Sequence, residues 1–418
     1  MTATTSAGSR NANGRSGTTG AGTTGAGATG GGAITPTPDG WTGASTVAPS
    51  RRHRLAALAL PVAGLWSAGE LAAGIAWLRG APGNPAVPRP DEEPGLSVLH
   101  LMTPDVGAAV LAALGGVGLA LVGAMAVQRR SVTGGAARRR GPGREVRGSG
   151  PDARRGVALV VGLATALGAL LTLVLPDYRL LAWTAYLPII AVMSLTGTMP
   201  EGVDVWPWPV VHMALATLGG LALVVAAAQH RRLTARCRDC GRSGSPGRFA
   251  AWAVRRAPWA VGVAVAIPVG YAVTRLAWAL GIPLGISQEM LDELADIVWM
   301  GAGLAVLAIG GAVLTLGLVQ RWGEVFPRWM LGVRGRRVPI GLAVVPASVV
   351  SVLVTSAGLM FVRYALAGGF SAGVPGEESD VAAWLPEMFW PLWGAALGLA
   401  TYAYAVRRRA ACARCGRR

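Results

Sequence analysis

The sequence contains no lysine, and few of its residues carry a charge. Of its 418 residues, 14% are charged and 52% are hydrophobic, a balance that soluble proteins of this length rarely show. Without lysine, glycine-rich stretches such as Gly115-Gly116 and Gly310-Gly311 cannot form a phosphate-binding loop; inside apolar runs they predict close contacts between helices. The His-Glu-x-x-His pattern of zinc proteases is also absent. No motif for nucleotide hydrolysis or metal-dependent proteolysis is therefore present.

The sequence is dominated by long apolar runs. Stretches of about 20 apolar residues recur along the chain, and each has about the length of a helix that crosses a bilayer. The net charge of +17 first suggests a nucleic-acid partner. The arginines lie between the apolar runs, however, where they set the orientation of membrane spans. We therefore predict an all-α, polytopic helical membrane protein that binds the lipid bilayer and no nucleic acid.

We predict about eight transmembrane helices, arranged as two tandem four-helix repeats. Residues 1–50 are rich in glycine and threonine and cannot bury a core, so we expect a disordered N-terminal tail. The first membrane repeat takes residues 51–246 and the second takes residues 247–418. The expected spans lie near residues 55–78, 104–127, 156–175, 209–229, 258–281, 294–319, 338–366 and 388–406.

Two markers recur in both halves of the chain. The second expected span of each half ends in the same three residues, Val127-Gln128-Arg129 and Val319-Gln320-Arg321. Each half then closes with an arginine cluster followed by Cys-x-x-Cys-Gly-Arg. The first half is the longer one, and we assign its extra residues to loops, where insertions are tolerated. These markers indicate a direct duplication.

Arginines are concentrated in alternate loops. The loops at 51–54, 129–155, 231–256, 321–337 and 407–418 are basic, whereas acidic residues gather in the other loops. Because basic loops stay on the cytoplasmic side, we predict that both termini are cytoplasmic and that the number of spans is even. The protein would lie in the plasma membrane, with a basic cytoplasmic face that suits anionic lipids.

One apolar segment does not fit this alternation. Residues 178–199 are apolar enough to span the membrane, but a span here would put Arg155 and Arg231 on opposite sides. The segment also carries Trp183 and Tyr186, and aromatic residues suit the membrane interface. We predict a re-entrant or interfacial segment on the outer face, with a ninth span as the alternative.

All four cysteines lie in the two repeated knuckles, as Cys237 and Cys240 and as Cys412 and Cys415. Two-residue spacing lets both thiolates of a turn reach one tetrahedral metal, and the following glycine permits the tight turn. At the cytoplasmic face a structural disulfide is not expected. We predict one shared structural zinc ion; redox-active pairs and cysteines left unused after duplication are the alternatives. Four cysteine ligands would leave no open position for catalysis.

Two charged residues lie inside apolar runs. Glu70 is in the first expected span and Arg275 is in the fifth, at depths of about 24 and 28 Å from the cytoplasmic boundary. Charges inside a bilayer are costly and are usually paired or turned towards water. We predict an intramembrane pair between these two residues; the alternative is that each extends to the outer headgroups. For Arg363 and Glu387, nearer the span ends, extension to the headgroups is expected.

Three other polar residues lie near the ends of the expected spans. His100, Asp105 and His212 would form an outward-facing metal or acid–base site if folding brought them together. A lone histidine at the end of a span is more typical of the membrane interface. We therefore expect interfacial positions and assign no catalytic residue.

The two Cys-x-x-Cys-Gly-Arg tails and residues 320–364 resemble uncharacterised multi-span membrane proteins of Streptomyces-type actinobacteria. The resemblance covers most of the chain beyond residue 50. It implies a membrane location and no known activity.

Three classes of function fit these features. A carrier or export-type transporter is narrowly favoured, because duplicated halves often enclose a substrate site at the midplane. The alternative is a non-enzymatic membrane scaffold or regulatory subunit, with a zinc-clamped basic cytoplasmic face that binds a protein partner or anionic lipid. An enzyme that acts through the cysteine pairs or the outer acidic loops comes third. The spans hold few ionisable groups, which counts against an ion-driven pump.

Overall fold

Helices make up the regular structure of the described part of the chain, apart from one isolated β-bridge between Val325 and Arg337. The computed structural model describes residues 57–89, 96–138, 151–199, 204–235, 237, 240, 247–330, 332–367, 380–409 and 412. These residues belong to one compact unit, Pro49–Arg418. The predicted tail, residues 1–50, lies outside the described residues.

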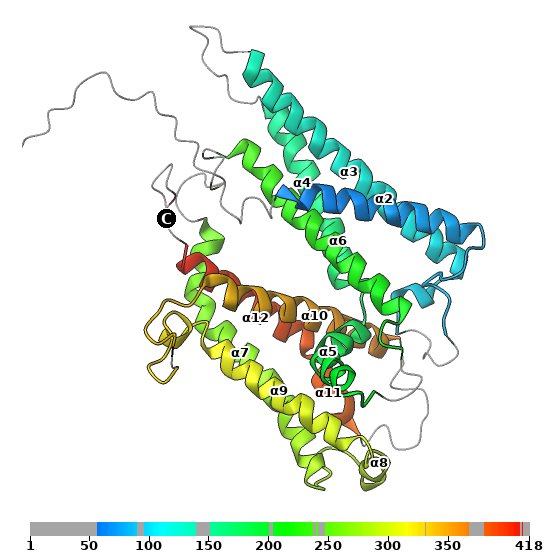
Figure 1. Ribbon diagram of the computed structural model, residues 1–418, viewed down its shortest axis with the longest axis vertical. Coiled ribbons are helices and arrows are strands. Elements are labelled where there is room, and N and C mark those ends of the chain that lie inside the picture. The colour runs from blue at the N-terminus through cyan, green and yellow to red at the C-terminus, as the bar shows by residue number, and fades with distance from the viewer. Residues whose placement is uncertain are drawn as a thin grey trace, which may run out of the picture. The chain divides into compact units, whose positions relative to one another are not determined.

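The helices follow the predicted order of spans (Figure 1). The first predicted repeat forms α2 (Ala59–Leu78), η1 (Val98–Leu101), α3 (Pro104–Arg138), α4 (Pro151–Leu173), α5 (Tyr178–Thr196), α6 (Trp208–His230) and η2 (Arg231–Thr234). The second forms α7 (Arg248–Ala279), α8 (Gln288–Glu293), α9 (Val298–Leu316), η3 (Arg321–Gly323), α10 (Ile340–Leu366), α11 (Val381–Met388) and α12 (Trp390–Arg407). Eight described helices are long and apolar enough to cross a membrane, which confirms the predicted all-α polytopic class. Seven of these helices are predicted spans and the eighth is α5, whereas α12 is not in this set.

The long helices form two groups that pack in the same order. In the first group, α2 packs on α3 and on α6, and α4 packs on α6. In the second group, α7 packs on α9 and on α12, and α10 packs on α12. In both groups the first helix therefore packs on the second and the fourth, and the third packs on the fourth. Although α12 is not among the eight candidate spans, it occupies the place of α6, with Tyr404 fully buried.

Glycine allows the closest helix contacts in the first group. Gly115 of α3 lies against Leu71 of α2, and a Cβ atom on Gly115 would come within 2.4 Å of the Leu71 backbone nitrogen. Gly74 of α2 lies against Ala112 of α3 in the same way, so the two helices run antiparallel. The predicted close contact is thus confirmed at Gly115. It is wrong for Gly310-Gly311, where a Cβ atom would meet nothing within 4 Å.

The direction of α4 and α6 decides how α5 can lie. Gly168 of α4 lies against Val224 of α6, whereas Thr172 lies against Gly220, so α4 and α6 run antiparallel. The chain therefore leaves α4 and enters α6 at the same end of the first group, which a single crossing by α5 would not allow. The geometry favours the predicted re-entrant or interfacial position, although α5 has the length and composition of a span.

Candidate metal centre

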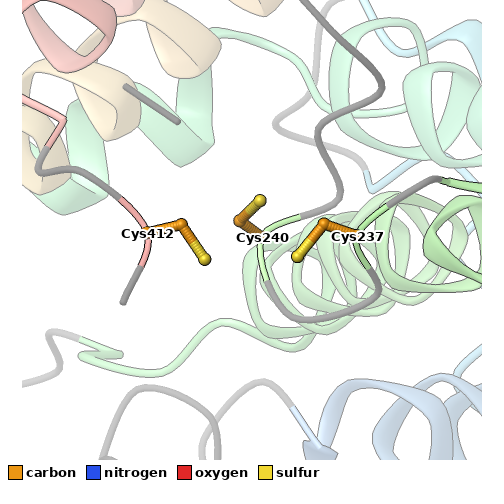
Figure 2. Close-up of side chains that lie close together, drawn as sticks. All are labelled: Cys237, Cys240 and Cys412. Carbon is orange, nitrogen blue, oxygen red and sulfur yellow. The ribbon is translucent and has the colours of Figure 1, made fainter. Parts of the chain in front are cut away.

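Three cysteine side chains from the two predicted repeats lie together. The sulfur atoms of Cys237, Cys240 and Cys412 all lie within 4.8 Å of one another. Figure 2 shows Cys237 and Cys240 on one turn of the chain, with Cys412 facing them from the C-terminal segment. In a tetrahedral site with metal–sulfur bonds of about 2.3 Å, neighbouring sulfur atoms lie about 3.8 Å apart. The spacing of the three thiols therefore suits a shared metal ion.

The first two thiols follow a helix end that is fixed by buried contacts. The His230 side chain, at the last residue of α6, is fully buried, and its Nε2 lies 2.6 Å from Oε1 of Gln128 on α3. Arg129 donates a hydrogen bond to the carbonyl oxygen of Ala226 at 3.3 Å. The chain continues into η2, which packs on α4. Cys237 and Cys240 thus extend from a rigid platform.

Packing between α7 and α12 brings the third thiol to the same place. The short segment after the first knuckle leads into α7, whose first turns pack against the last turns of α12. The rings of Phe249 and Tyr402 are 5.5 Å apart, and Ala253 and Ala403 are buried between the two helices. Because α7 begins beside the end of α12, Cys412 comes close to the knuckle that precedes α7.

Arginines precede both knuckles. Arg231 and Arg232 begin η2, and Arg407 and Arg408 lie at the end of α12. Arg408 donates a hydrogen bond to the Tyr404 hydroxyl at 2.6 Å, which holds this positive charge beside the helix end. Positive charge near a thiol favours the thiolate, the form that binds metals and attacks disulfides. The site is also partly shielded, since one thiol is buried and two are half-buried.

The donor set indicates which ions suit the site. Thiolates are soft ligands that select zinc, copper(I) or iron–sulfur clusters over magnesium and calcium. The fourth predicted ligand, Cys415, lies outside the described residues. Three thiolates alone would leave one position open to water or substrate, whereas a fourth would close the site and make it structural.

The predicted pair between Glu70 and Arg275 is wrong, because each of these residues has a partner in its own half of the chain. Glu70 Oε1 lies 2.9 Å from Nε2 of His212, and both side chains are buried between α2 and α6. The Trp77 ring packs edge-on against the His212 ring, with centroids 5.7 Å apart. The physical reason is the antiparallel packing of α2 and α6, which sets the end of one beside the start of the other.

Arg275 of α7 finds its partner on α11. Its Nη2 donates to Oε1 of Glu387 at 2.8 Å. The guanidinium also donates to two backbone carbonyl groups of α11, at 3.0 and 3.1 Å. The rings of Tyr271 and Trp278 flank it, with centroids 4.6 and 4.2 Å from its central carbon. Arg275 is therefore neutralised and hydrogen-bonded within the second group.

Glu387 is buried rather than extended to the headgroups. Its exposed fraction is 6%, and among the described residues its Oε2 has no hydrogen-bond partner. Burial raises the pKa of Glu387 to about 7, and the positive charge of Arg275 opposes this rise without cancelling it. Glu387 lies in α11, outside the eight helices that could span, and it can take up a proton near neutral pH.

Neither His212 nor Glu387 was predicted as the partner of a buried charge. His212 lies in the first turns of α6 and Glu387 lies just before α12, so each precedes or begins the fourth helix of its group. If the first and fourth helices of each group had been known to run antiparallel, the residues at the start of the fourth helix would have been the expected partners. His100 lies in η1 and Asp105 in the first turn of α3, while His212, the third member of the imagined outer site, is engaged by Glu70.

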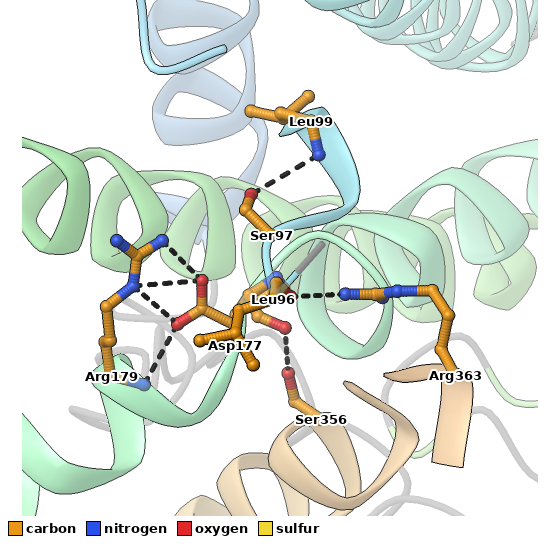
Figure 3. Close-up of polar contacts among 8 residues, drawn as sticks. Leu96, Ser97, Leu99, Asp177, Arg179, Ser356 and Arg363 are labelled. Atoms are coloured by element: carbon orange, nitrogen blue, oxygen red, sulfur yellow. Dashed lines mark hydrogen bonds and ion pairs between the residues drawn. The ribbon is translucent and has the colours of Figure 1, made fainter. Parts of the chain in front are cut away.

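The two groups also meet away from the cysteines, where α10 packs against α4 and α5. Ser356 donates a hydrogen bond from Oγ to the carbonyl oxygen of Pro176 at 2.8 Å (Figure 3). Arg363 donates from Nη2 to the carbonyl oxygen of Leu96 at 2.5 Å. Arg363 was expected to extend to the headgroups; instead it is half-buried and links α10 to the first predicted repeat.

A Gly-x-Ser-x-Gly pattern at residues 369–373 lies outside the described residues. That pattern marks a hydrolase nucleophile where it joins a strand to a helix, whereas here it follows the helix α10. No family model, curated protein or solved structure matches the chain. The function therefore has to be argued from the geometry.

Proposed function

We propose that the protein is a multi-pass membrane scaffold whose two helical groups are joined at one end by a thiolate metal centre. The observation that carries the proposal is the approach of Cys412, from the second repeat, to Cys237 and Cys240, from the first. Such a site needs both halves of the chain. Metal binding at a site that one conformation preforms stabilises that conformation, so the ion would fix how the two knuckles face the partner.

Zinc suits the proposed ligand set. Two Cys-x-x-Cys-Gly turns are the usual halves of a four-cysteine zinc site, and Cys415 would supply the fourth thiolate. The ion would then have no open position, so it would support the fold and take no part in a reaction. The redox alternative makes a different prediction, namely a disulfide within the Cys237 and Cys240 turn.

The same proposal places both knuckles and both termini in the cytoplasm, at the plasma membrane. Support comes from the arginine clusters beside the knuckles and from the four antiparallel helices of each group, which return the chain to the side where it began. The shared order of helix pairing supports an origin by duplication. The basic cytoplasmic face would then meet anionic lipids or an acidic protein partner.

A carrier is the second candidate, favoured by the buried charges of Glu70 within α2 and Arg275 within α7. Buried ionisable residues in membrane helices often mark a substrate or ion path. A charged path between the two repeats would need Glu70 and Arg275 to lie together. Each charge is instead neutralised within its own group, so the charged residues line no common path. This difference favours the scaffold over the carrier.

Metal analysis of the purified chain tests the centre. Protein purified in mild detergent should hold about one zinc ion per chain, by the four-cysteine stoichiometry. Cys237→Ser and Cys412→Ser should each lose most of the zinc, whereas Ser131→Ala, an exposed position on α3, should keep it. A metal-free parent chain with an oxidised Cys237–Cys240 pair would contradict the proposal and favour redox chemistry.

Partner capture tests the scaffold role. Cross-linking in intact producing cells should trap the same protein partner in repeated experiments with the parent chain. Cys412→Ser should trap less of it, because the knuckles would no longer be held together. Equal capture by the parent and by the variant, with zinc lost only from the variant, would show that the centre does not organise a partner surface.

A further inference from the structure

The second group contains an open apolar groove that the metal centre does not use. Its volume is about 1010 Å³, at the upper end of the range of about 300–1,000 Å³ that is usual for ligand sites. α9 and α10 form its walls, and α12 contributes Trp393 and Leu397. Trp322 and Phe326, from the segment between α9 and α10, close one end. The lining is almost wholly apolar, so the groove suits a hydrocarbon ligand.

The segment that closes the end of the groove is held in place by hydrogen bonds. Within the segment between α9 and α10, the Phe326 nitrogen donates to the Arg336 carbonyl at 3.0 Å, and the Gly335 nitrogen donates to the Phe326 carbonyl at 3.0 Å. The hydroxyl group of the fully buried Tyr404 donates to the carbonyl of Gly323 at 2.6 Å, which fastens the segment to α12. In the first group, the corresponding helices α3 and α4 pack on each other instead.

The depth of the groove matches one leaflet of a bilayer. Leu342, Pro346 and Val350 line it from one face of α10, at a spacing of four residues. These three residues cover about 12 Å of helix, and the segment that closes the end of the groove extends it further towards the arginine-rich end. The hydrocarbon core of one leaflet is about 15 Å deep, half of a core of about 30 Å. An acyl chain of that leaflet would therefore lie along the groove.

Positive charge lies at the closed end of the groove. Residues 321–338 contain five arginines and one acidic residue, and all five arginines are exposed. Arg321 directly precedes Trp322, and Arg328 directly precedes Trp329, which is 77% exposed; both tryptophans line the groove. Aromatic and basic residues together are typical of the level of the lipid headgroups. The groove therefore combines an apolar body with a basic mouth.

We propose that this groove binds one anionic phospholipid of the arginine-side leaflet. Its acyl chains would lie against α9 and α10, and its phosphate would meet Arg321 and Arg328. Charge complementarity favours this occupant over a zwitterionic lipid, because the choline cation of such a lipid offsets its phosphate and leaves no net negative charge to match the arginines. The groove is separate from the cysteines, so the proposed lipid site does not depend on the proposed metal centre and can be tested separately.

Native mass spectrometry of the full-length chain tests the charged mouth. Detergent-purified, delipidated protein is incubated with palmitoyl-oleoyl phosphatidylglycerol or with the matching phosphatidylcholine, and the parent should retain one phosphatidylglycerol in preference. Arg321→Gln with Arg328→Gln should weaken that binding about 30-fold, since each arginine near a lipid surface contributes about 1 kcal/mol and tenfold is about 1.4 kcal/mol. Arg154→Gln with Arg155→Gln removes the same charge from exposed positions of α4 and should leave binding unchanged.

A second pair of variants tests the apolar body. Ala347 lines the groove, whereas Val345 is 61% exposed on the same helix and is outside the lining. Ala347→Phe should lose the retained lipid and Val345→Phe should keep it, with unchanged elution in size exclusion for both. Equal retention by both variants, or an equal loss in the Arg154 and Arg155 control, would mean a nonspecific annular lipid and would overturn the proposal. A polypeptide retained in place of lipid would assign the groove to a partner helix and overturn it as well.

Discussion

Separate replacement of the two members of the Arg275–Glu387 pair should have very unequal effects on stability. Arg275→Met removes the donor from two α11 carbonyl groups, and each buried acceptor left without a donor costs about 1–3 kcal/mol. It also removes the contacts with two aromatic rings, at about 0.5–1 kcal/mol each. The expected loss in the free energy of unfolding is on the order of 3–8 kcal/mol, at least as large as the loss of about 3–5 kcal/mol on breaking a buried ion pair.

Glu387→Gln should cost little, and at alkaline pH it should stabilise the protein. Burial raises the pKa of Glu387 from 4.5 to about 7, so in between these values the folded state holds more protons than the unfolded state. Stability contributed by this group is full below about pH 4.5 and is lost as the pH rises through 7. At about 1.4 kcal/mol per pKa unit, the loss amounts to roughly 3 kcal/mol. Glutamine resembles the protonated form of Glu387 and cannot lose a proton, so the Glu387→Gln variant does not lose this stability as the pH rises.

Thermal or denaturant unfolding in detergent at pH 5 and pH 8 measures both effects. The difference in stability between Glu387→Gln and the parent should be small at pH 5 and should shift in favour of the variant at pH 8. Glu289→Gln, an exposed position on α8, is the matched control and should follow the parent at both pH values. The reasoning is refuted if Glu387→Gln destabilises as much as Arg275→Met, or if its difference from the parent does not change with pH.

Two further substitutions test buried contacts, and reporter fusions test the membrane topology. His212→Phe should lower stability by about 3–5 kcal/mol, because Glu70 would stay buried without its partner, and His212→Gln should recover part of the loss in the same unfolding assay. Gly115→Leu should cost about 3 kcal/mol or more, because its Cβ would collide with the Leu71 backbone, and Gly123→Leu, where a Cβ would meet nothing within 4 Å, should not. Reporter fusions after residues 150, 245 and 418 should report cytoplasm and fusions near 90, 285 and 375 the outside; an outside signal at 245 would make α5 a crossing helix.

Membrane spans could be predicted because the thickness of a bilayer sets the length of an apolar helix that crosses it. Span limits were less accurate where a helix continues past the apolar core. The sequence predicts a span that begins at Pro258, whereas α7 begins at Arg248 and contains Pro258 in its interior. Hydropathy marks where the chain enters the membrane, but it does not mark where the helix begins. The short helices α8 and α11 were missed for a related reason, since neither has the length of an apolar run.

Ligand spacing within a turn could be read from the sequence, but partners on different helices could not. Cys237 and Cys240 are two residues apart, so their joint approach to a metal is a local property, and the shared arginine clusters suggested where Cys412 would be. Glu70 and Arg275 were matched by depth and by opposite charge. Depth alone does not say which helices are neighbours, and the contacts of α2 with α6 and of α7 with α11 gave each charge a closer partner.

Loss of a metal from the cysteine centre should affect one end of the molecule and leave each helical group folded. The close contacts of α2 with α3 and of α10 with α12 are internal to a group, and both buried charge pairs are as well. Between the groups, Arg363 and Ser356 of α10 hold the junction away from the cysteines without help from a metal. A thiolate centre would therefore add a second point of attachment, between the ends of α6 and α12. An ion in that position would constrain the surface at the ends of α6 and α12 and leave the packing inside each helical group unchanged. A scaffold requires such a constraint and a catalytic centre does not.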